Sequence, residues 1–167
     1  MKTKLVYLLL FRGVGGATQL PAAPLREALT VAGFEKVATY INSGNAVVRS
    51  GLPRAKVIAT VARICEEKFG FTKAIFAPTL EEWSDLVGNN PFPQAVDAPK
   101  YLHAALLAER PVAANVKAVN AFARPEEGFA IIGNVAYLHT PGGFGTSKLA
   151  EKFDKGIGVS NTARNWN

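Results

Sequence analysis

The sequence is poor in the residues that stabilise small secreted or metal-binding proteins. One of its 167 residues is cysteine, Cys65, so an intramolecular disulfide and a zinc site built from thiolates are both excluded. So few cysteines are typical of proteins in a reducing cytosol, and we expect a cytoplasmic location. No apolar stretch approaches the length of a transmembrane helix, so no membrane partner is expected.

Charge and histidine are also sparse. Charged residues make up 19% of the chain and hydrophobic residues 49%, which is typical of a globular protein and not of a disordered one. No run of Lys or Arg forms a basic arm. His103 and His139 fall in strand-like segments without the second ligand that a metal site needs, so we expect both to be satisfied structural residues. No metal or cofactor is expected, and no Ser-His-Asp or Cys-His arrangement is found.

The first half of the chain has the pattern of an α+β unit. Residues 5–11 are a continuous apolar run before a glycine, which is typical of a central strand buried on both faces. Helices are predicted over residues 24–32 and 53–69, and strands over 34–40, 46–49 and 71–77, with a hairpin turn at 41–45. This βαββαβ order predicts a ferredoxin-like N-terminal subdomain over residues 1–78.

The second half repeats much of this pattern. Residues 79–99 are predicted to form a short helix and then a linker. The helix begins with a capping box at Thr79 and Glu82, and the linker is rich in Pro and Asn. Strands are predicted over 101–107, 129–132 and 135–139, and helices over 111–122 and 147–153. Residues 100–167 are therefore expected to form a second subdomain, a βαββα unit with the C-terminal motif docked onto it.

Three polar loops could hold an anion. Arg12 and Gly13 follow the first strand in a glycine-rich segment whose backbone amides can approach a ligand closely, although no helix opens directly after it as a dinucleotide fingerprint requires. Residues 42–45, Asn-Ser-Gly-Asn, suit a tight hairpin. Ser147 and Lys148 begin a helix after a glycine-rich loop, which suits a phosphate or carboxylate, but their order excludes a P-loop.

The C-terminal residues 160–167, Ser-Asn-Thr-Ala-Arg-Asn-Trp-Asn, are rich in fixed-geometry donors for a segment that would ordinarily fray. Arg164 offers a planar fork for carboxylate or phosphate, and Asn165 adds an amide donor and acceptor. Trp166 provides a ring on which a base could stack. We expect this segment to be docked on the domain.

These segments together resemble a known bacterial family. Residues 11–16, residues 40–45, Ser147-Lys148-Leu149 and residues 162–167 are similar to those of a family of uncharacterised proteins named domain of unknown function 1697. The resemblance covers essentially the whole chain. It implies an α+β fold with ferredoxin-like parts and no established activity. Family members typically read Leu-Leu-Arg-Gly-x-Asn-Val-Gly-Gly at the first motif, whereas this loop lacks the x-Asn pair.

We predict that the protein binds a phosphate-bearing anionic ligand, either a nucleotide or single-stranded nucleic acid, in keeping with its net charge of +6. The expected binding residues are Arg12, Gly13, Asn42, Ser43, Asn45, Lys148, Arg164, Asn165 and Trp166. Two alternatives stay open. One is an enzyme acting on a small anionic substrate, although the motifs contain no general base. The other is a purely structural role for the C-terminal motif. The sequence does not predict an oligomeric state.

Overall fold

A computed structural model of the protein describes residues 3–40 and 44–167. The chain divides into two compact units, Met1–Asp85 and Leu86–Asn167. The fold is mixed α+β, with five α-helices and two four-stranded antiparallel sheets in the described residues, so the α+β part of the expected fold class is confirmed. No helix in the described ranges is long and apolar enough to cross a membrane.

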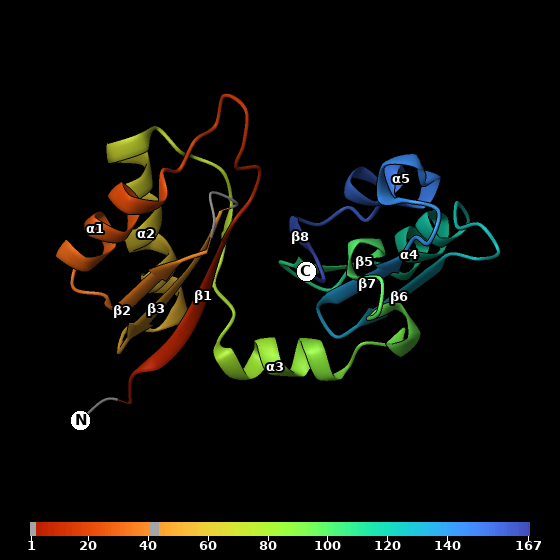
Figure 1. The fold of residues 1–167 in the computed structure, drawn as a ribbon, viewed down its shortest axis with the longest axis horizontal. Coiled ribbons are helices and arrows are strands. Elements are labelled where there is room, and N and C mark those ends of the chain that lie inside the picture. The colour runs from red at the N-terminus through yellow and green to blue at the C-terminus, as the bar shows by residue number, and fades with distance from the viewer. Residues whose placement is uncertain (1–2, 41–43) are drawn as a thin grey trace. The chain divides into compact units, whose positions relative to one another are not determined.

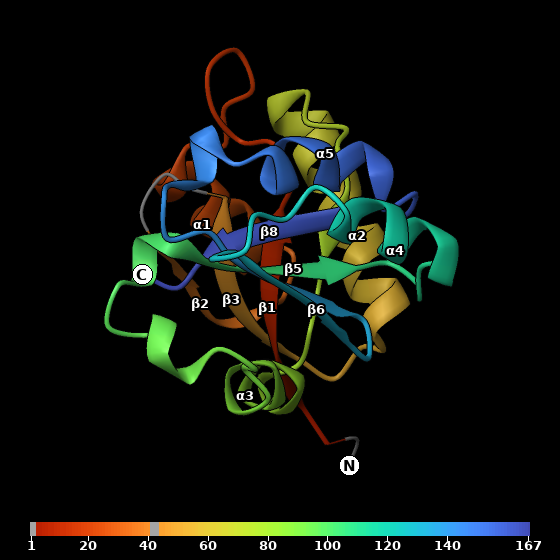
Figure 2. The ribbon, with the colours of Figure 1, turned by 90° about the vertical axis from the view of Figure 1, so that its right-hand side faces the viewer.

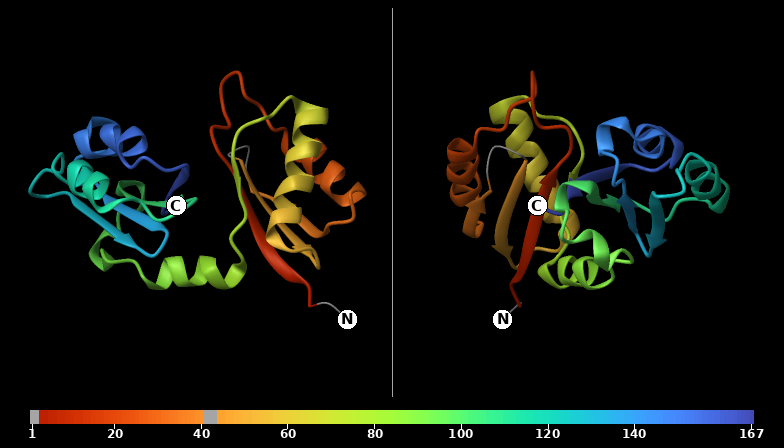
Figure 3. Two further views of the ribbon diagram at one scale, coloured as in Figure 1. Left: turned by 180° about the vertical axis from the view of Figure 1, so that it is seen from behind. Right: turned by 45° about the vertical axis from the view of Figure 1, so that its right-hand side comes forward.

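The first unit is built around one antiparallel sheet with the strand order β2-β3-β1-β4. The elements of this unit are, in chain order, β1 (Leu5–Phe11), α1 (Ala22–Val31), β2 (Glu35–Thr39), β3 (Asn45–Ser50), α2 (Arg54–Phe69), β4 (Ile75–Phe76) and α3 (Leu80–Gly88), which runs into the second unit. Helices α1 and α2 both lie on one face of the sheet (Figures 1 and 3). The apolar run of residues 5–11 is therefore a central strand, as predicted.

The core of the first unit lies between the sheet and its two helices. Alternate residues of β1, including Leu9 and Phe11, point to the helices, because side chains alternate across a strand. They pack there against Leu29 of α1 and Val61 of α2. Burying each such side chain contributes about 1.5–3 kcal/mol, so this single strand anchors much of the unit.

The end of α2 and the start of α3 are fixed by a glycine and by a capping box that the sequence predicts. Gly70 takes a left-handed conformation (φ 65°) and closes α2, and its N–H donates to the Glu66 carbonyl at 3.0 Å. At the start of α3 the predicted capping box is present. The Thr79 amide donates to the Glu82 carboxylate at 2.8 Å, and the Glu82 amide donates to the Thr79 hydroxyl at 3.2 Å.

The second unit also contains one antiparallel sheet, with the strand order β6-β7-β5-β8. Its elements after α3 are η1 (Pro93–Ala95), η2 (Pro99–Tyr101), β5 (Leu102–Leu107), α4 (Ala113–Asn120), β6 (Gly128–Ile132), β7 (Val135–His139), η3 (Phe144–Thr146), α5 (Lys148–Gly156) and β8 (Asn161–Asn165). Its core gathers Leu107 and Leu138 from the sheet with Leu149, Phe153 and Ile157 around α5.

The second unit has one strand more than the expected βαββα arrangement. Residues Asn161–Asn165, expected to be a docked polar segment, form β8 and pair with β5 over five residues (Figure 2). The strand was missed because it has no apolar run. Ala163 packs on the core of the unit, whereas Thr162 and Arg164, its sequence neighbours, point to the opposite face. In the first unit, the strand that was expected over residues 71–77 is shorter, since β4 covers only Ile75–Phe76.

Candidate strand-end site

Three segments of the first unit meet at one end of its sheet. Strand β1 runs antiparallel to both of its neighbours, so its last residue lies beside the first residues of β3 and β4. The Phe11 amide donates to the Gly44 carbonyl at 2.9 Å, and the Arg12 amide donates to the Ala74 carbonyl at 3.0 Å. The residues around Arg12, Gly44 and Ala74 are therefore held together by backbone hydrogen bonds.

The loop after β1 has a backbone that requires glycine. Gly13, Gly15 and Gly16 have φ angles of 68°, 138° and 57°, which side-chain-bearing residues rarely adopt. Gly15 and Thr18 exchange backbone hydrogen bonds of 2.7 and 3.0 Å, which close the loop into a tight turn. Gly13, Gly15 and Gly16 are exposed, so an anion can approach the backbone amides of the loop that the turn does not use.

The other two segments press closely on this loop. A β-carbon at Gly44 would lie 2.8 Å from the Val14 Cγ2 atom and 3.0 Å from the Phe11 carbonyl oxygen. A β-carbon at Gly13 would lie 3.0 Å from the Lys73 ammonium nitrogen. Only glycine therefore fits at either place without a shift of its neighbours, and the Lys73 side chain lies directly over Gly13.

Lys73 is the basic residue of this group that the sequence analysis missed. It was assigned to a strand over residues 71–77, but in the structure it lies in the connection before β4 and its side chain is exposed. Its ammonium makes no hydrogen bond or ion pair with any residue in the described part of the chain. A basic residue next to a short apolar strand was the only available signal, and it is a weak one.

The expected residues of the first unit are brought together in part. Arg12 and Gly13 lie at the end of β1, and Asn45 is the first residue of β3, where its carbonyl accepts a hydrogen bond from the Tyr40 amide at 3.1 Å. Asn42 and Ser43 lie outside the described residues, so their part in the site stays a prediction. Arg12, Gly13 and Asn45 thus adjoin one another around the backbone of Gly44.

In the second unit, Lys148 is the first residue of α5. The preceding Ser147 caps the helix, since its hydroxyl accepts from the Ala150 amide at 3.2 Å. The Lys148 ammonium lies 2.7 Å from the Glu151 carboxylate, one turn along the helix. Hydrogen bonds from Lys148 and Lys152 lower the pKa of Glu151 to about 2. The charge of Lys148 is therefore already matched by an anion of its own helix.

The C-terminal residues occupy defined places on β8. One Arg164 guanidinium nitrogen donates to the Thr162 hydroxyl at 2.8 Å and to the Ala163 carbonyl at 2.9 Å, and burial lowers the pKa of Arg164. Asn165 is exposed. The Trp166 amide donates to the Leu102 carbonyl at 2.9 Å, which continues the pairing with β5 beyond the end of β8.

His103 does not match its expected role as a satisfied structural residue. Its ring stacks on Phe144, with ring centroids 3.9 Å apart and an interplanar angle of 27°. Its Nδ1 atom is buried and has no hydrogen-bond partner among the described residues. Because burial disfavours the charged imidazolium, it lowers the pKa of His103 to about 4. The expectation that this side chain is satisfied is therefore wrong.

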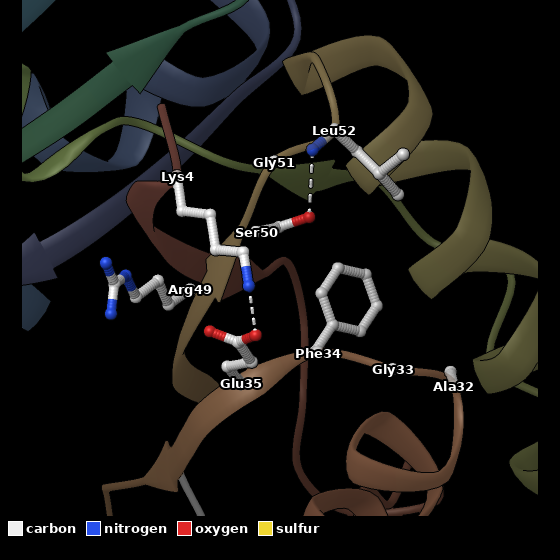
Figure 4. A pocket seen from close by; sticks show the side chains of 9 residues that line it. All are labelled: Lys4, Ala32, Gly33, Phe34, Glu35, Arg49, Ser50, Gly51 and Leu52. Atoms are coloured by element: carbon white, nitrogen blue, oxygen red, sulfur yellow. Dashed lines mark hydrogen bonds and ion pairs between the residues drawn. The ribbon is translucent and has the colours of Figure 1, made fainter. Parts of the chain in front are cut away.

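A small pocket lies at the opposite end of the first sheet from the strand-end loops. It has a volume of about 300 Å³ and lies beside Phe34 and Ser50, between the start of β2 and the end of β3. Lys4 and Glu35 point toward one another across its mouth (Figure 4). The hydrogen bond from Lys4 lowers the pKa of Glu35 below its ordinary value. The Ser50 hydroxyl accepts from the Leu52 amide at 3.1 Å, so these polar groups are engaged with one another.

No cluster of three or more potential metal ligands occurs among the residues that the structure describes. Cys65 is buried in the core of the first unit, and desolvation raises the pKa of its thiol to about 12. A thiol with such a pKa is protonated at neutral pH and is a poor nucleophile.

The chain matches a known protein family. The model of a family described as a protein of unknown function, DUF1697, matches residues 5–137. The chain belongs to this family. The match covers most of the chain and includes β1, the strand-end loops and α2, whereas α5 and β8 follow it. No curated protein matches the sequence.

A solved structure has a similar fold. The conserved bacterial protein SP0830 from Streptococcus pneumoniae is 20% identical to this DUF1697 protein, with a TM-score of 0.72. The match covers 98% of this chain and 93% of that one, so both units are included. At this level of identity the similarity establishes a shared fold and not a shared activity.

Proposed function

We propose that this protein binds a phosphate-bearing anionic ligand, and that the strand-end loops of the first unit carry the site. The observation that supports this most directly is the position of Lys73 over the glycine loop. Its ammonium lies close to Gly13 and has no partner in the described part of the chain. The half-buried Arg12 adjoins it, because the Arg12 amide donates to the carbonyl of Ala74, the residue after Lys73. Exposed amides of a glycine turn beside two cations are the groups that bind phosphate.

The proposal is for binding and not for turnover. The described residues of the three segments, 12–16, 44–45 and 72–74, include no imidazole or carboxylate that could act as a general acid or base. The enzyme alternative therefore has no observation in its favour at this site. A nucleotide and a single strand of nucleic acid share the phosphate that these groups would bind, and the two differ in how many phosphates are contacted at once.

A second role, for the C-terminal motif, is favoured by a separate observation. Residues 161–165 supply an edge strand of the second sheet, and the Arg164 side chain donates hydrogen bonds to Thr162 and Ala163 of its own strand. We propose that this motif is primarily structural. Contact of Asn165 and Trp166 with a ligand stays a prediction.

We also infer that each unit is a ferredoxin-like βαββαβ unit. The element order of the first unit and its strand order β2-β3-β1-β4 support this, as does the matching order β6-β7-β5-β8 of the second. We propose a cytoplasmic location, which is supported by the single, buried cysteine.

The test is a thermal-shift and binding titration of the full chain against inorganic phosphate, ADP and a short single-stranded DNA. A ligand that binds only the folded state raises the melting temperature by mass action. We expect Lys73→Ala to weaken binding about tenfold, as the loss of a charge-assisted hydrogen bond does, without unfolding the protein. Lys56→Ala, on the exposed face of α2, is the matched control and should bind as the wild type does.

The salt dependence of binding separates the two ligand classes. An oligonucleotide that contacts several phosphate-binding groups should lose affinity steeply with added salt, whereas a mononucleotide should respond weakly. Equal binding by Lys73→Ala and Lys56→Ala, or no binding of any of the three probes, would contradict the proposal.

A further inference from the structure

The four edge strands of the two sheets differ in how they are protected from pairing with another chain. In the first unit, β4 has only two residues, and the pairing of β2 is interrupted near Lys36, which has a φ of 50°. In the second unit, β8 carries the charged Arg164. Natural proteins use short strands, irregular pairing and charge to block unwanted edge pairing.

Strand β6 has none of these protections. Its sequence, Gly-Phe-Ala-Ile-Ile, contains no charge and no proline, and its five residues pair with β7 in unbroken register. It is an edge strand of the second sheet, next to β7 only. An apolar, regular edge of this kind is a template for the addition of another strand.

The turn between β6 and β7 determines which backbone groups of β6 face outward. Gly133, with a φ of 59°, and Asn134 form a two-residue hairpin turn. In such a hairpin the residues that flank the turn, here Ile132 and Val135, form a hydrogen-bonded pair, and pairs then alternate along the strands. The N–H and C=O groups of Phe129 and Ile131 therefore point away from β7 toward the open edge.

A groove accompanies this edge. It has a volume of about 500 Å³ and lies between β6 and α4. Val116, Phe129 and Ile131 form its apolar floor, and these side chains are partly buried against the core of the unit. Arg110 and Lys117 line it with exposed side chains that make no hydrogen bond or ion pair within the described ranges.

We propose that this groove binds an extended acidic peptide, which adds as a fifth strand to the β6 edge of the second sheet. The peptide backbone bonds with the outward groups of Phe129 and Ile131. Alternate side chains of the peptide cover the apolar floor, and its carboxylates meet Arg110 and Lys117. A second copy of this chain fits less well, because it brings the same two cations and a net charge of +6 to the interface.

The first experiment measures the fluorescence anisotropy of a labelled peptide of alternating valine and glutamate, titrated with the full chain. We expect saturable binding that is lost when lysine replaces glutamate in the peptide. Ile131→Pro removes an outward N–H that β7 does not use, so the fold should persist, while binding weakens at least about tenfold. Ile131→Val keeps the N–H and is the matched control.

Charge reversal supplies a second comparison. Lys117→Glu should weaken binding about threefold or more, whereas Lys155→Glu, an equal change of charge on exposed α5, should not. If Ile131→Pro does not fold, hydrogen exchange on the wild type decides the question. The amides of Phe129 and Ile131 should exchange fast in the free protein and be protected with peptide.

Three results would overturn the proposal. One is binding that is equally strong with the lysine peptide. Another is an absence of added protection at Phe129 and Ile131. The third is a dimer in sedimentation experiments that Ile131→Pro abolishes, since the edge would then serve a second copy of the chain.

Discussion

The two units of this protein hold their strand ends together in the same way but place different residues there. In the first unit the amides of Phe11 and Arg12 donate to the carbonyls of Gly44 and Ala74. In the second unit the amides of Leu107 and Ala108 donate to the carbonyls of Asn134 and Ser160, at 2.8 Å each. The bonds match one for one, so the two units have equivalent registers at this end of the sheet.

The difference lies in the side chains that this shared backbone presents. The first unit places Arg12 and Lys73 around a glycine turn, and the second places Ala108 and Val159 at the equivalent positions. The second unit instead carries an unprotected edge strand and both histidines. One framework therefore presents different chemical groups in its two units, because strand pairing fixes the positions while the residues at those positions differ.

The largest expected effect comes from removing β8. Deletion of residues 160–167 takes away a strand that pairs with β5 over five residues, so the core of the second unit should open. We expect calorimetry to show a melting temperature lower by about 10 °C or more. Asn165→Ala, at an exposed side chain of the same strand, should melt close to the wild type. A deletion variant with an unchanged melting temperature would show that β8 does not stabilise the sheet.

Replacing a turn glycine by alanine should destabilise the first unit more than the second. Gly44→Ala introduces a β-carbon into positive φ and into contact with Val14, which should cost about 3 kcal/mol. Gly133→Ala meets no atom within 4 Å and should cost about 1 kcal/mol, from its backbone conformation alone. Chemical denaturation measures both free energies of unfolding. Equal costs would contradict the close packing around Gly44.

A smaller effect is expected on the pH dependence of stability, and it comes from His103 of the second unit. The pKa of His103 is lowered from 6.5 to about 4 in the folded protein, so the unfolded chain binds the proton more readily. Stability that is present above pH 6.5 is therefore lost as the pH falls toward about 4. We expect a loss of about 1 kcal/mol, discounted for the partial exposure of the ring.

The control for this effect is His103→Phe, which keeps the ring stacking on Phe144 and removes the titration. Its free energy of unfolding, measured by denaturation at several pH values, should vary less across this window than that of the wild type. A variant whose stability falls as steeply as the wild type's would show that other groups carry the acid sensitivity.

Sequence patterns predicted the elements that depend on local signals. The apolar run of residues 5–11 gave the central strand, and the pairing of Thr79 with Glu82 gave the start of α3. Strand β8 could not be found in this way. Its apolar contact with the core is a small residue, Ala163, between the polar Thr162 and Arg164, and what makes it a strand is pairing with the distant β5.

The candidate site was predicted only in part for a similar reason. Arg12 and Gly13 stand out in the sequence because glycines follow a strand. Lys73 does not, because its proximity to Gly13 depends on the antiparallel pairing of β1 with β4. The ion pair of Lys148 with Glu151 follows from a spacing of three residues on a helix, a signal that the sequence analysis did not use.

The most direct test of the account is an NMR titration of the ¹⁵N-labelled full chain with ADP. We predict saturable shifts of the amides of Gly13, Gly15 and Gly16 in the first unit. The equivalent strand end of the second unit, at Ala108 and Asn134, should not respond. Shifts at the second strand end instead, or no shift at the glycine loop at any concentration of ADP, would contradict the assignment of anion binding to the first unit.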